Sequence, residues 1–83
     1  MNSSLYYSTM KPQIELVNQV RQYRRSADIT QEQLAEQVGV TRQTILSIEK
    51  GKYTPSVALA LQLSAALRVR VDELFQLQKG EVP

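Results

Sequence analysis

The chain has 83 residues, and its ten Lys and Arg against eight Asp and Glu leave a formal net charge of +2. It contains no cysteine and no histidine, which excludes disulfides, Cys/His metal sites and catalysis by a nucleophile–histidine pair. A chain of this length forms one small domain, and its longest uncharged run, residues 53–67, is too short to span a bilayer. We therefore expect a cytoplasmic, non-enzymatic protein without a metal or cofactor.

Residues 1–11 are mostly polar and are expected to form an N-terminal arm with no core pattern of its own. The next stretch has two readings. Its apolar residues fit a helical stripe beginning near Pro12, yet residues 14–17 also fit a short strand, with Asn18 capping a later helix. Both readings place a helix over residues 19–25. At the turn that follows, Asp28 is a residue type that tolerates a left-handed backbone.

A capping box opens the next predicted helix. The Thr30 hydroxyl can accept a hydrogen bond from the Gln33 N–H, while the Gln33 side chain reaches back to Thr30. Gly39 supplies the left-handed residue that ends this helix. The residues between them that form the inward stripe are Leu34, Ala35 and Val38.

A second short helix follows after a tight turn filled by Val40. Thr41 is its expected N-cap, and Gly51 ends it after Lys50. At about 100° per residue, one side of the helix, expected to face the core, carries Thr41, Ile45 and Ile48, with Glu49 at its edge. The opposite side carries Gln43, Leu46, Ser47 and Lys50, flanked by Arg42 and Thr44.

Two short helices joined by a tight turn, the second with an uncharged polar face outward, have the layout of a DNA-reading helix-turn-helix. Gln, Arg and Ser side chains can hydrogen-bond to base edges, and an outward Leu46 suits a thymine methyl. The alternative is a solvated helix face with one exposed leucine, since scattered exposed apolar residues are normal. The clustering of Arg42, Lys50 and Lys52 favours nucleic acid more than the small net charge does.

The loop after this helix carries Lys52 and Tyr53, which can reach a DNA phosphate. Pro55 favours an extended residue before it, and Ser56 can cap the next helix. That helix, residues 57–67, has no charged residue. Leu61 and Ala65 are surplus apolar surface beside its core stripe of Leu59, Ala60, Leu63 and Leu67.

The last apolar residues of the pattern are Val69, Val71, Leu74, Phe75 and Leu77. We place the folded domain at residues 12–78, preceded by the arm and followed by a tail of residues 79–83.

The helix-turn-helix stretch resembles the Xre/Cro family, the fold of lambdoid phage repressors. RQTI followed by IEKGKYTPS is most similar to the small cytolysin-repressor-like regulators, and the resemblance covers roughly residues 20–77. The residues that stand in the family pattern are Gln31, Leu34, Ala35, Val38, Gly39, Ile45, Ile48, Glu49, Gly51 and Lys52.

The resemblance implies a mainly all-α, compact five-helix fold with a small antiparallel pairing of the N- and C-terminal segments. It also implies a structural ion pair between Arg24 and Glu49. Two residues depart from the family pattern: Arg68 stands where a glycine or asparagine usually ends a helix, and Arg70 stands where a Ser or Thr usually caps the next one. Both weaken the predicted boundaries between residues 67 and 72.

We therefore expect a transcription regulator, a repressor that binds an inverted-repeat operator in double-stranded DNA as a homodimer. The expected base readers are Arg42, Gln43, Thr44, Leu46 and Ser47. The expected phosphate contacts are Gln31, Arg42, Lys50, Lys52 and Tyr53. The expected dimer interface comprises Leu61, Ala65, Val71, Leu74, Phe75 and Leu77. The alternative function is an antitoxin or another interaction module whose main partner is a toxin or a regulatory protein, with secondary DNA binding.

Overall fold

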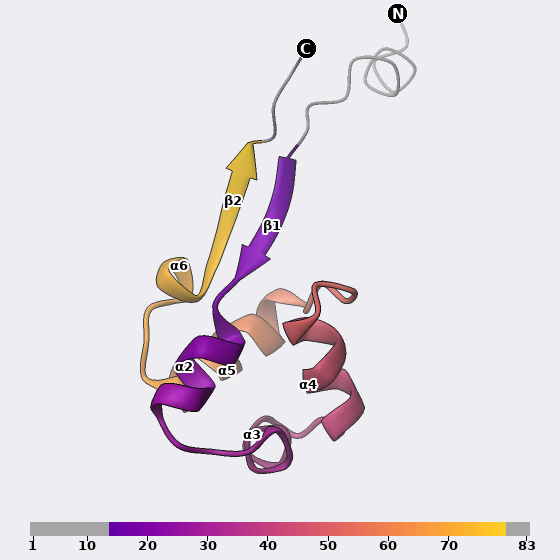
Figure 1. The fold of residues 1–83 in the computed structure, drawn as a ribbon, viewed down its shortest axis with the longest axis vertical. Helices are drawn as coiled ribbons and strands as arrows, with labels where there is room; N and C mark the ends of the chain where they lie inside the picture. The colour runs from indigo at the N-terminus through magenta and orange to yellow at the C-terminus, as the bar shows by residue number, and fades with distance from the viewer. Residues whose placement is uncertain (1–13, 80–83) are drawn as a thin grey trace, which may run out of the picture.

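The computed structural model describes residues 14–79 as a body of helices from which a two-stranded ribbon projects (Figure 1). The expected five-helix fold with a small antiparallel pairing is confirmed. The N-terminal arm, residues 1–11, lies outside the described residues. The elements in chain order are β1 (Ile14–Asn18), α2 (Val20–Ser26), α3 (Gln31–Val38), α4 (Arg42–Glu49), α5 (Val57–Leu67), α6 (Val71–Leu74) and β2 (Phe75–Lys79).

The ribbon settles the two readings of the stretch before α2 in favour of the strand. β1 and β2 pair antiparallel, from Ile14 opposite Lys79 to Asn18 opposite Phe75. A helix through residues 14–18 is therefore wrong. The local pattern did not distinguish the two because the pairing partner lies about sixty residues further along the chain, and strand preference depends on such neighbours. β2 also extends to Lys79, one residue beyond the predicted end of the domain.

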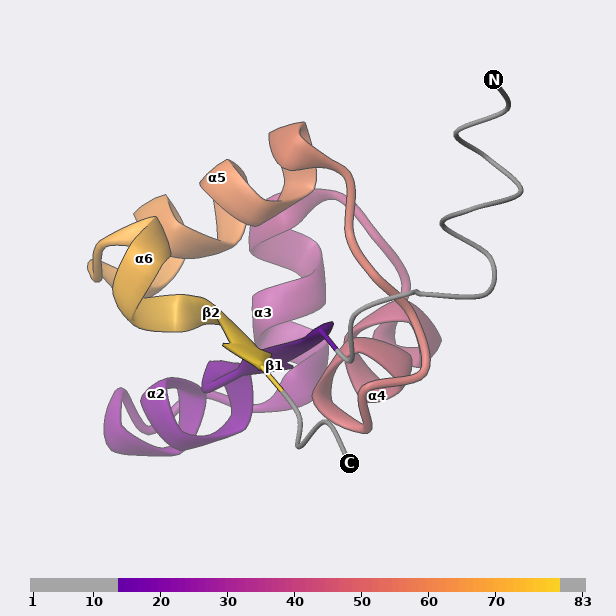
Figure 2. The ribbon, with the colours of Figure 1, turned by 90° about the horizontal axis from the view of Figure 1, so that it is seen from above.

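The core forms where α3, α4 and α5 meet, and in the view from above α2, α4 and α5 lie around α3 (Figure 2). Thr41 is an exception to the predicted inward faces: it is exposed, because it serves as the N-cap of α4. Ala60 is only half-buried. The buried apolar residues are Val20, Leu34, Ala35, Val38, Ile45, Ile48, Leu59, Leu63, Leu67 and Leu74.

Each of the four longer helices is followed, directly or after one further residue, by a residue with a left-handed backbone. The N–H of the next residue then bonds back to a carbonyl of the last turn, which satisfies a group that the helix leaves unpaired. These bonds join Ile29 to Arg24, Val40 to Ala35, Lys52 to Ser47 and Val69 to Ser64, with N–O distances of 2.9 to 3.3 Å. The left-handed residues are Asp28 (φ 61°), Gly39 (75°), Gly51 (74°) and Arg68 (59°).

At the boundaries before α6, two arginines stand where a helix-ending glycine and a helix-capping Ser or Thr are usual. Arg68 adopts the left-handed conformation in place of a glycine, so α5 still ends at Leu67. The Arg70 N–H donates to Glu73 Oε1 at 3.2 Å, and this bond opens α6 in place of a Ser or Thr cap. Arg70 also pairs with Asp72 on the surface. The hydrogen bond that Arg70 donates to Asp72, together with the charges of Asp72 and Glu73, raises the pKa of Arg70.

Within residues 14–79, no helix has the length and apolar character needed to cross a membrane.

Candidate nucleic-acid interface

The N-terminus of α4 is fixed by its cap. Thr41 Oγ1 accepts from the Thr44 N–H at 3.3 Å, so the helix begins at the residue predicted from the sequence. On the inner face Ile45 and Ile48 are completely buried. Two consecutive turns of chain are thereby held against the core, and the opposite face is left to the solvent.

The outward face of α4 carries the side chains expected to read bases. Arg42, Gln43 and Lys50 are exposed, and Thr44, Leu46 and Ser47 are half-buried. Gln43 Nε2 lies 3.4 Å from Ser47 Oγ, so these two polar groups sit side by side one helical turn apart. The predicted set is thus gathered on one side of one helix.

The loop after α4 folds back beside this face. A hollow of about 290 Å³ is lined by three residues of α4 and two of the loop: Gln43, Thr44, Ser47, Lys52 and Tyr53. Half of the Tyr53 side chain is exposed, and Lys52 is exposed. The structure therefore brings the predicted phosphate-contacting loop residues together with three predicted base readers.

A second hollow, of about 390 Å³, lies beside the N-terminus of α3 and reaches Arg42 on α4. Arg25 also lines this hollow and is exposed, although the sequence analysis did not assign it to the DNA face. The signal available was its position in the last turn of α2, next to the turn leading into α3. Two acidic residues, Asp28 and Glu32, line the same hollow and moderate its positive charge.

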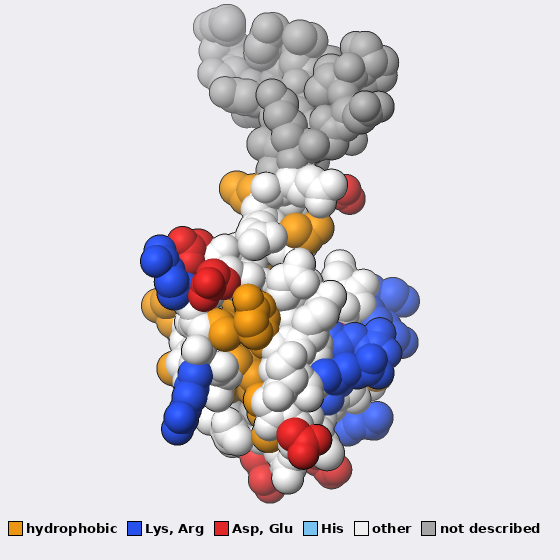
Figure 3. Space-filling model, turned by 60° about the vertical axis from the view of Figure 1, so that its left-hand side comes forward, with side chains coloured by type: hydrophobic (Ala, Val, Ile, Leu, Met, Phe, Trp, Pro, Cys, Tyr) orange, Lys and Arg blue, Asp and Glu red, His pale blue; other side chains and the backbone are white. Residues whose placement is uncertain are grey.

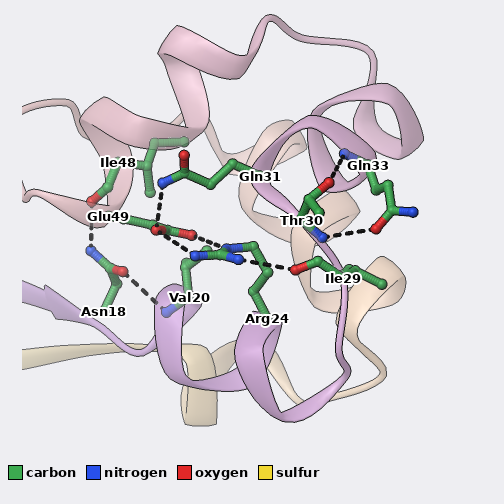
Figure 4. A network of polar contacts seen from close by, with 9 residues as sticks. All are labelled: Asn18, Val20, Arg24, Ile29, Thr30, Gln31, Gln33, Ile48 and Glu49. Atoms are coloured by element: carbon green, nitrogen blue, oxygen red, sulfur yellow. Dashed lines mark hydrogen bonds and ion pairs between the residues drawn. The ribbon is translucent and has the colours of Figure 1, made fainter.

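An almost buried ion pair fixes the C-terminal end of α4 (Figure 4). Arg24 Nε lies 2.6 Å from Glu49 Oε2, with 11% and 3% of the two side chains exposed. Arg24 Nη1 also donates to the Ile29 carbonyl at 2.9 Å, across the turn between α2 and α3. The pair expected from the family resemblance is therefore present, and it joins α2, the following turn and α4.

Gln31 was expected at a phosphate, and the structure places its side chain on the ion pair. Gln31 Nε2 donates to Glu49 Oε1 at 3.1 Å, which leaves one N–H of the amide for another acceptor. Glu49 is thus held by Arg24 from α2 and by Gln31 from α3 (Figure 4). Sequence spacing did not reveal this third member, because the three residues lie on three separate helices.

Asn18 makes a further bond to α4 that the sequence did not reveal. Its Oδ1 accepts from the Val20 N–H at 3.1 Å, although the N-cap of α2 is the next residue, Gln19, and not Asn18 as predicted. Its Nδ2 donates to the Ile48 carbonyl at 2.9 Å, thirty residues along the chain. The same side chain therefore connects the start of α2 to the last turn of α4 (Figure 4).

Basic side chains are unevenly distributed over the surface. In Figure 3 a group of Lys and Arg side chains gathers along the right-hand edge of the helical body. Acidic side chains lie at its lower end and, beside a basic one, at its upper left. Such separation gives a locally positive surface on a chain with a small net charge.

The predicted dimer interface requires a correction at Leu74. This residue is 0% exposed in the core, so it has no surface to offer a partner, and Phe75 also packs partly against the core. Leu61 is 53% exposed and Leu77 is 73% exposed, while Ala65 and Val71 are also exposed. Leu16, opposite Leu77 in the ribbon, and Val57, 77% exposed, are further exposed apolar residues that the prediction omitted.

A capped helix, a left-handed glycine turn and a second helix with its polar face outward define a helix-turn-helix DNA-binding domain. A family model described as "Helix-turn-helix" matches residues 20–74, which cover α2 to α6. The chain belongs to this family of Cro/C1-type DNA-binding regulators.

Relatives from distant organisms carry the same domain. An uncharacterised HTH-type transcriptional regulator of Methanothermobacter thermautotrophicus is 48% identical over 61 residues, covering 72% of this chain and 88% of the relative. The uncharacterised HTH-type transcriptional regulator YgzD of Bacillus subtilis is 44% identical over 62 residues, covering 75% of this chain and 94% of the relative. The chain is therefore similar to transcriptional regulators over nearly their whole length.

Solved structures show the same arrangement of helices. The restriction-modification controller protein C.AhdI of Aeromonas hydrophila superposes with a TM-score of 0.62 and 30% identity, covering 65% of this chain and 78% of that one. A "putative DNA-binding protein" from Bacteroides fragilis superposes with a TM-score of 0.69 and 24% identity, and the match covers 74% of this chain and 98% of that one. The second likeness concerns the fold alone.

Proposed function

We propose that this DNA-binding regulator is a sequence-specific repressor that binds an inverted-repeat operator as a homodimer. The observation that carries the proposal is that α4 is held firmly on one side and exposes polar side chains on the other. Its inner face is buried, and its C-terminal end is fixed by Glu49 with Arg24 and Gln31. Within residues 14–79, its outer face presents polar side chains that are exposed or half-buried. A helix held in this way is suited to enter a major groove as a rigid element.

Base reading is assigned to the outward face of α4. Gln43 matches the donor and acceptor pattern of adenine N6 and N7, and Arg42 matches guanine O6 and N7. Leu46 suits a thymine methyl. Thr44 and Ser47 are half-buried beside Gln43, so they contribute shorter-range contacts.

Phosphate contacts are assigned to groups on either side of this face. Lys50 and Lys52 are exposed at the C-terminal end of α4, and Tyr53 adds a hydroxyl in the same hollow. At the other side, the backbone N–H groups at the start of α3 favour an anion, helped by the free N–H of Gln31. Arg25 joins this group because it lines the hollow with Gln31 and Arg42.

Homodimerisation is supported by apolar side chains that the monomer leaves exposed. Val57, Leu61 and Ala65 recur every four residues on α5, which has no charged residue, and Leu77 is exposed on β2. Isologous pairing of such a surface is the usual way in which a small chain forms a dimer. Two α4 helices would then meet successive major grooves about 34 Å apart.

A salt titration tests the proposal. Binding is measured to the DNA immediately upstream of the gene and to an unrelated duplex of equal length, at several salt concentrations. We expect tighter binding to the upstream fragment and a steep fall in affinity with salt, because several phosphates are neutralised. Equal, weak binding to both duplexes would contradict a repressor whose operator lies upstream of its own gene, and would favour the interaction module described next.

The second candidate is an interaction module whose main partner is another protein, such as a toxin. The same exposed residues, Val57, Leu61 and Leu77, support it. Sedimentation of the purified chain separates the two, because a homodimer covers this surface without a second protein. A monomer at micromolar concentration would favour the interaction module.

A further inference from the structure

We propose that Asn18 is a positioning residue for base reading: it sets the angle at which α4 is presented to DNA. This inference rests on the proposed function. Asn18 itself does not belong to the reading face, since it lies at the end of β1 and its side chain donates to the Ile48 carbonyl (Figure 4).

The two bonds of the Asn18 amide determine its orientation. Only the amide oxygen can accept from the Val20 N–H, at 3.1 Å, and this places the amide nitrogen at the Ile48 carbonyl, at 2.9 Å. The Ile48 carbonyl also accepts from the Gly51 N–H at 2.9 Å. The bond from Asn18 therefore acts on the turn that ends α4, next to Glu49.

The backbone around Asn18, at the junction of β1 with α2, is itself firmly held. The Gln19 N–H donates to the carbonyl of Leu74 at 2.8 Å, and Leu74 is completely buried. Asn18 stands opposite Phe75 in the ribbon, and Phe75 packs against the core. Asn18 thus joins a fixed frame, made by the junction of β1 with α2, to the last turn of the reading helix.

The length of α4 explains why loss of the bond between Asn18 and the Ile48 carbonyl should affect specificity. Eight residues make a helix of about 12 Å, so a tilt of about 5° at Ile48 moves the other end by roughly 1 Å. The other end carries Arg42 and Gln43, whose bidentate contacts require positions held within about 0.5 Å. Phosphate contacts from flexible lysines tolerate such a shift, because a point charge on a long side chain is less directional. Loss of the bond should therefore reduce discrimination more than overall affinity.

The ion pair of Glu49 does not make Asn18 redundant. Arg24 and Gln31 hold the Glu49 side chain, whereas Asn18 holds the backbone one residue earlier. A side chain can rotate about its own bonds while its charged end stays in place. Among the contacts that Asn18, Arg24 and Gln31 make with the end of α4, only that of Asn18 holds the backbone directly.

The test compares Asn18→Ala with Ser56→Ala. Ser56 caps α5 by accepting from the Leu59 N–H at 3.1 Å and has no bond to α4, so its loss destabilises the domain without altering the reading helix. The probe is a duplex that the wild-type chain selects from a random-sequence library, measured against a scrambled duplex of the same composition. All variants are measured at a temperature at which circular dichroism shows them folded.

We expect Asn18→Ala to lower the preference for the selected duplex by about three- to tenfold, as for the loss of one directional bond. Affinity for the scrambled duplex should change by less than about twofold, and Ser56→Ala should leave the preference unchanged. A second variant, Asn18→Asp, keeps the acceptor for the Val20 N–H and replaces the donor that faces Ile48. It should lose the same preference while retaining the start of α2.

The two levels of the proposal fail in different ways. If the wild-type chain enriches no sequence from the library, the proposed function fails and the role of Asn18 fails with it. If the wild-type chain enriches a sequence and both Asn18 variants keep the full preference, only the positioning role is overturned. An equal loss of preference in Ser56→Ala would also overturn it, because any destabilisation would then have the same effect.

Discussion

The ends of α3 and α4 differ from the ends of α2 and α5, although all four have the same backbone geometry. Around the reading helix the left-handed residue is glycine, at Gly39 and Gly51. At the other two ends it is Asp28 or Arg68. Most side chains in this conformation are strained by about 1–2 kcal/mol, and Asp by less, so two of the four turns carry a strain that the other two lack.

The two strained turns have a support that the glycine turns lack in the described part of the chain. After Asp28, the Ile29 carbonyl accepts from Arg24 Nη1 at 2.9 Å, and after Arg68 the Val69 carbonyl accepts from the Ser64 hydroxyl. Glycine makes the turn without help, whereas a larger residue is accompanied by a side-chain bond that holds the next carbonyl. Substitutions at these turns separate the two ways of ending a helix.

The largest expected effect is that of Arg24→Met, because Arg24 supports the Asp28 turn and also neutralises Glu49. The loss leaves a buried carboxylate uncompensated, and we expect the free energy of unfolding to fall by about 3–5 kcal/mol in urea titrations. Arg25→Met is the matched control for stability, since Arg25 is exposed. Similar unfolding midpoints for the two variants would contradict the role of the buried pair.

Gly51→Ala should lower the free energy of unfolding by about 1–2 kcal/mol, because φ there is 74°. A methyl group at Gly51 would meet no atom within 4 Å, so the loss reports backbone conformation alone. Arg68→Ala is the control, since that position already carries a side chain at φ 59°. If thermal unfolding showed equal, small losses of unfolding free energy for Gly51→Ala and Arg68→Ala, glycine would not be required at residue 51.

Ser64→Ala should cost about 1 kcal/mol in unfolding free energy, because it removes the hydrogen bond that supports the Arg68 turn. The informative experiment is a double-mutant cycle with Arg68→Gly. We expect Ser64→Ala to cost less when residue 68 is glycine. Strictly additive effects would mean that the serine bond and the strained turn are independent.

The smallest expected effect is a gain. Arg68→Gly removes the left-handed strain but adds flexibility to the unfolded chain, so unfolding free energy should rise by about 0.5–1 kcal/mol. Calorimetry should show a higher melting temperature. A lower melting temperature would indicate that the Arg68 side chain makes a stabilising contact that outweighs the strain.

The same comparison explains how much of the molecule could be predicted from sequence. The α3–α4 unit was predicted almost to the residue, because Thr30, Gly39, Thr41 and Gly51 are local signals that require no distant partner. The ribbon and the α5–α6 junction were less certain. β1 depends on pairing with β2, and Arg68 ends a helix with a residue type that gives no stop signal.

The features of the candidate DNA interface also divide into those that the sequence predicted and those that it did not. The outward face of α4 followed from helical periodicity, and the Arg24–Glu49 pair followed from the family resemblance. The contacts of Gln31 and Asn18 with the end of α4 were missed, because each joins residues eighteen or thirty positions apart on different elements. The burial of Leu74 was missed for the same reason: its neighbours come from distant parts of the chain.

The central claim is that the outward face of α4 reads DNA sequence, and Gln43→Ala tests it most directly. Binding is measured to the selected duplex, to single-base variants of it and to a scrambled duplex, with Lys52→Ala as the matched variant. We expect Gln43→Ala to relax discrimination at one operator position by about 1–3 kcal/mol, and Lys52→Ala to weaken all duplexes alike and reduce the salt slope. An equal loss of affinity for the selected and scrambled duplexes on Gln43→Ala would contradict the claim.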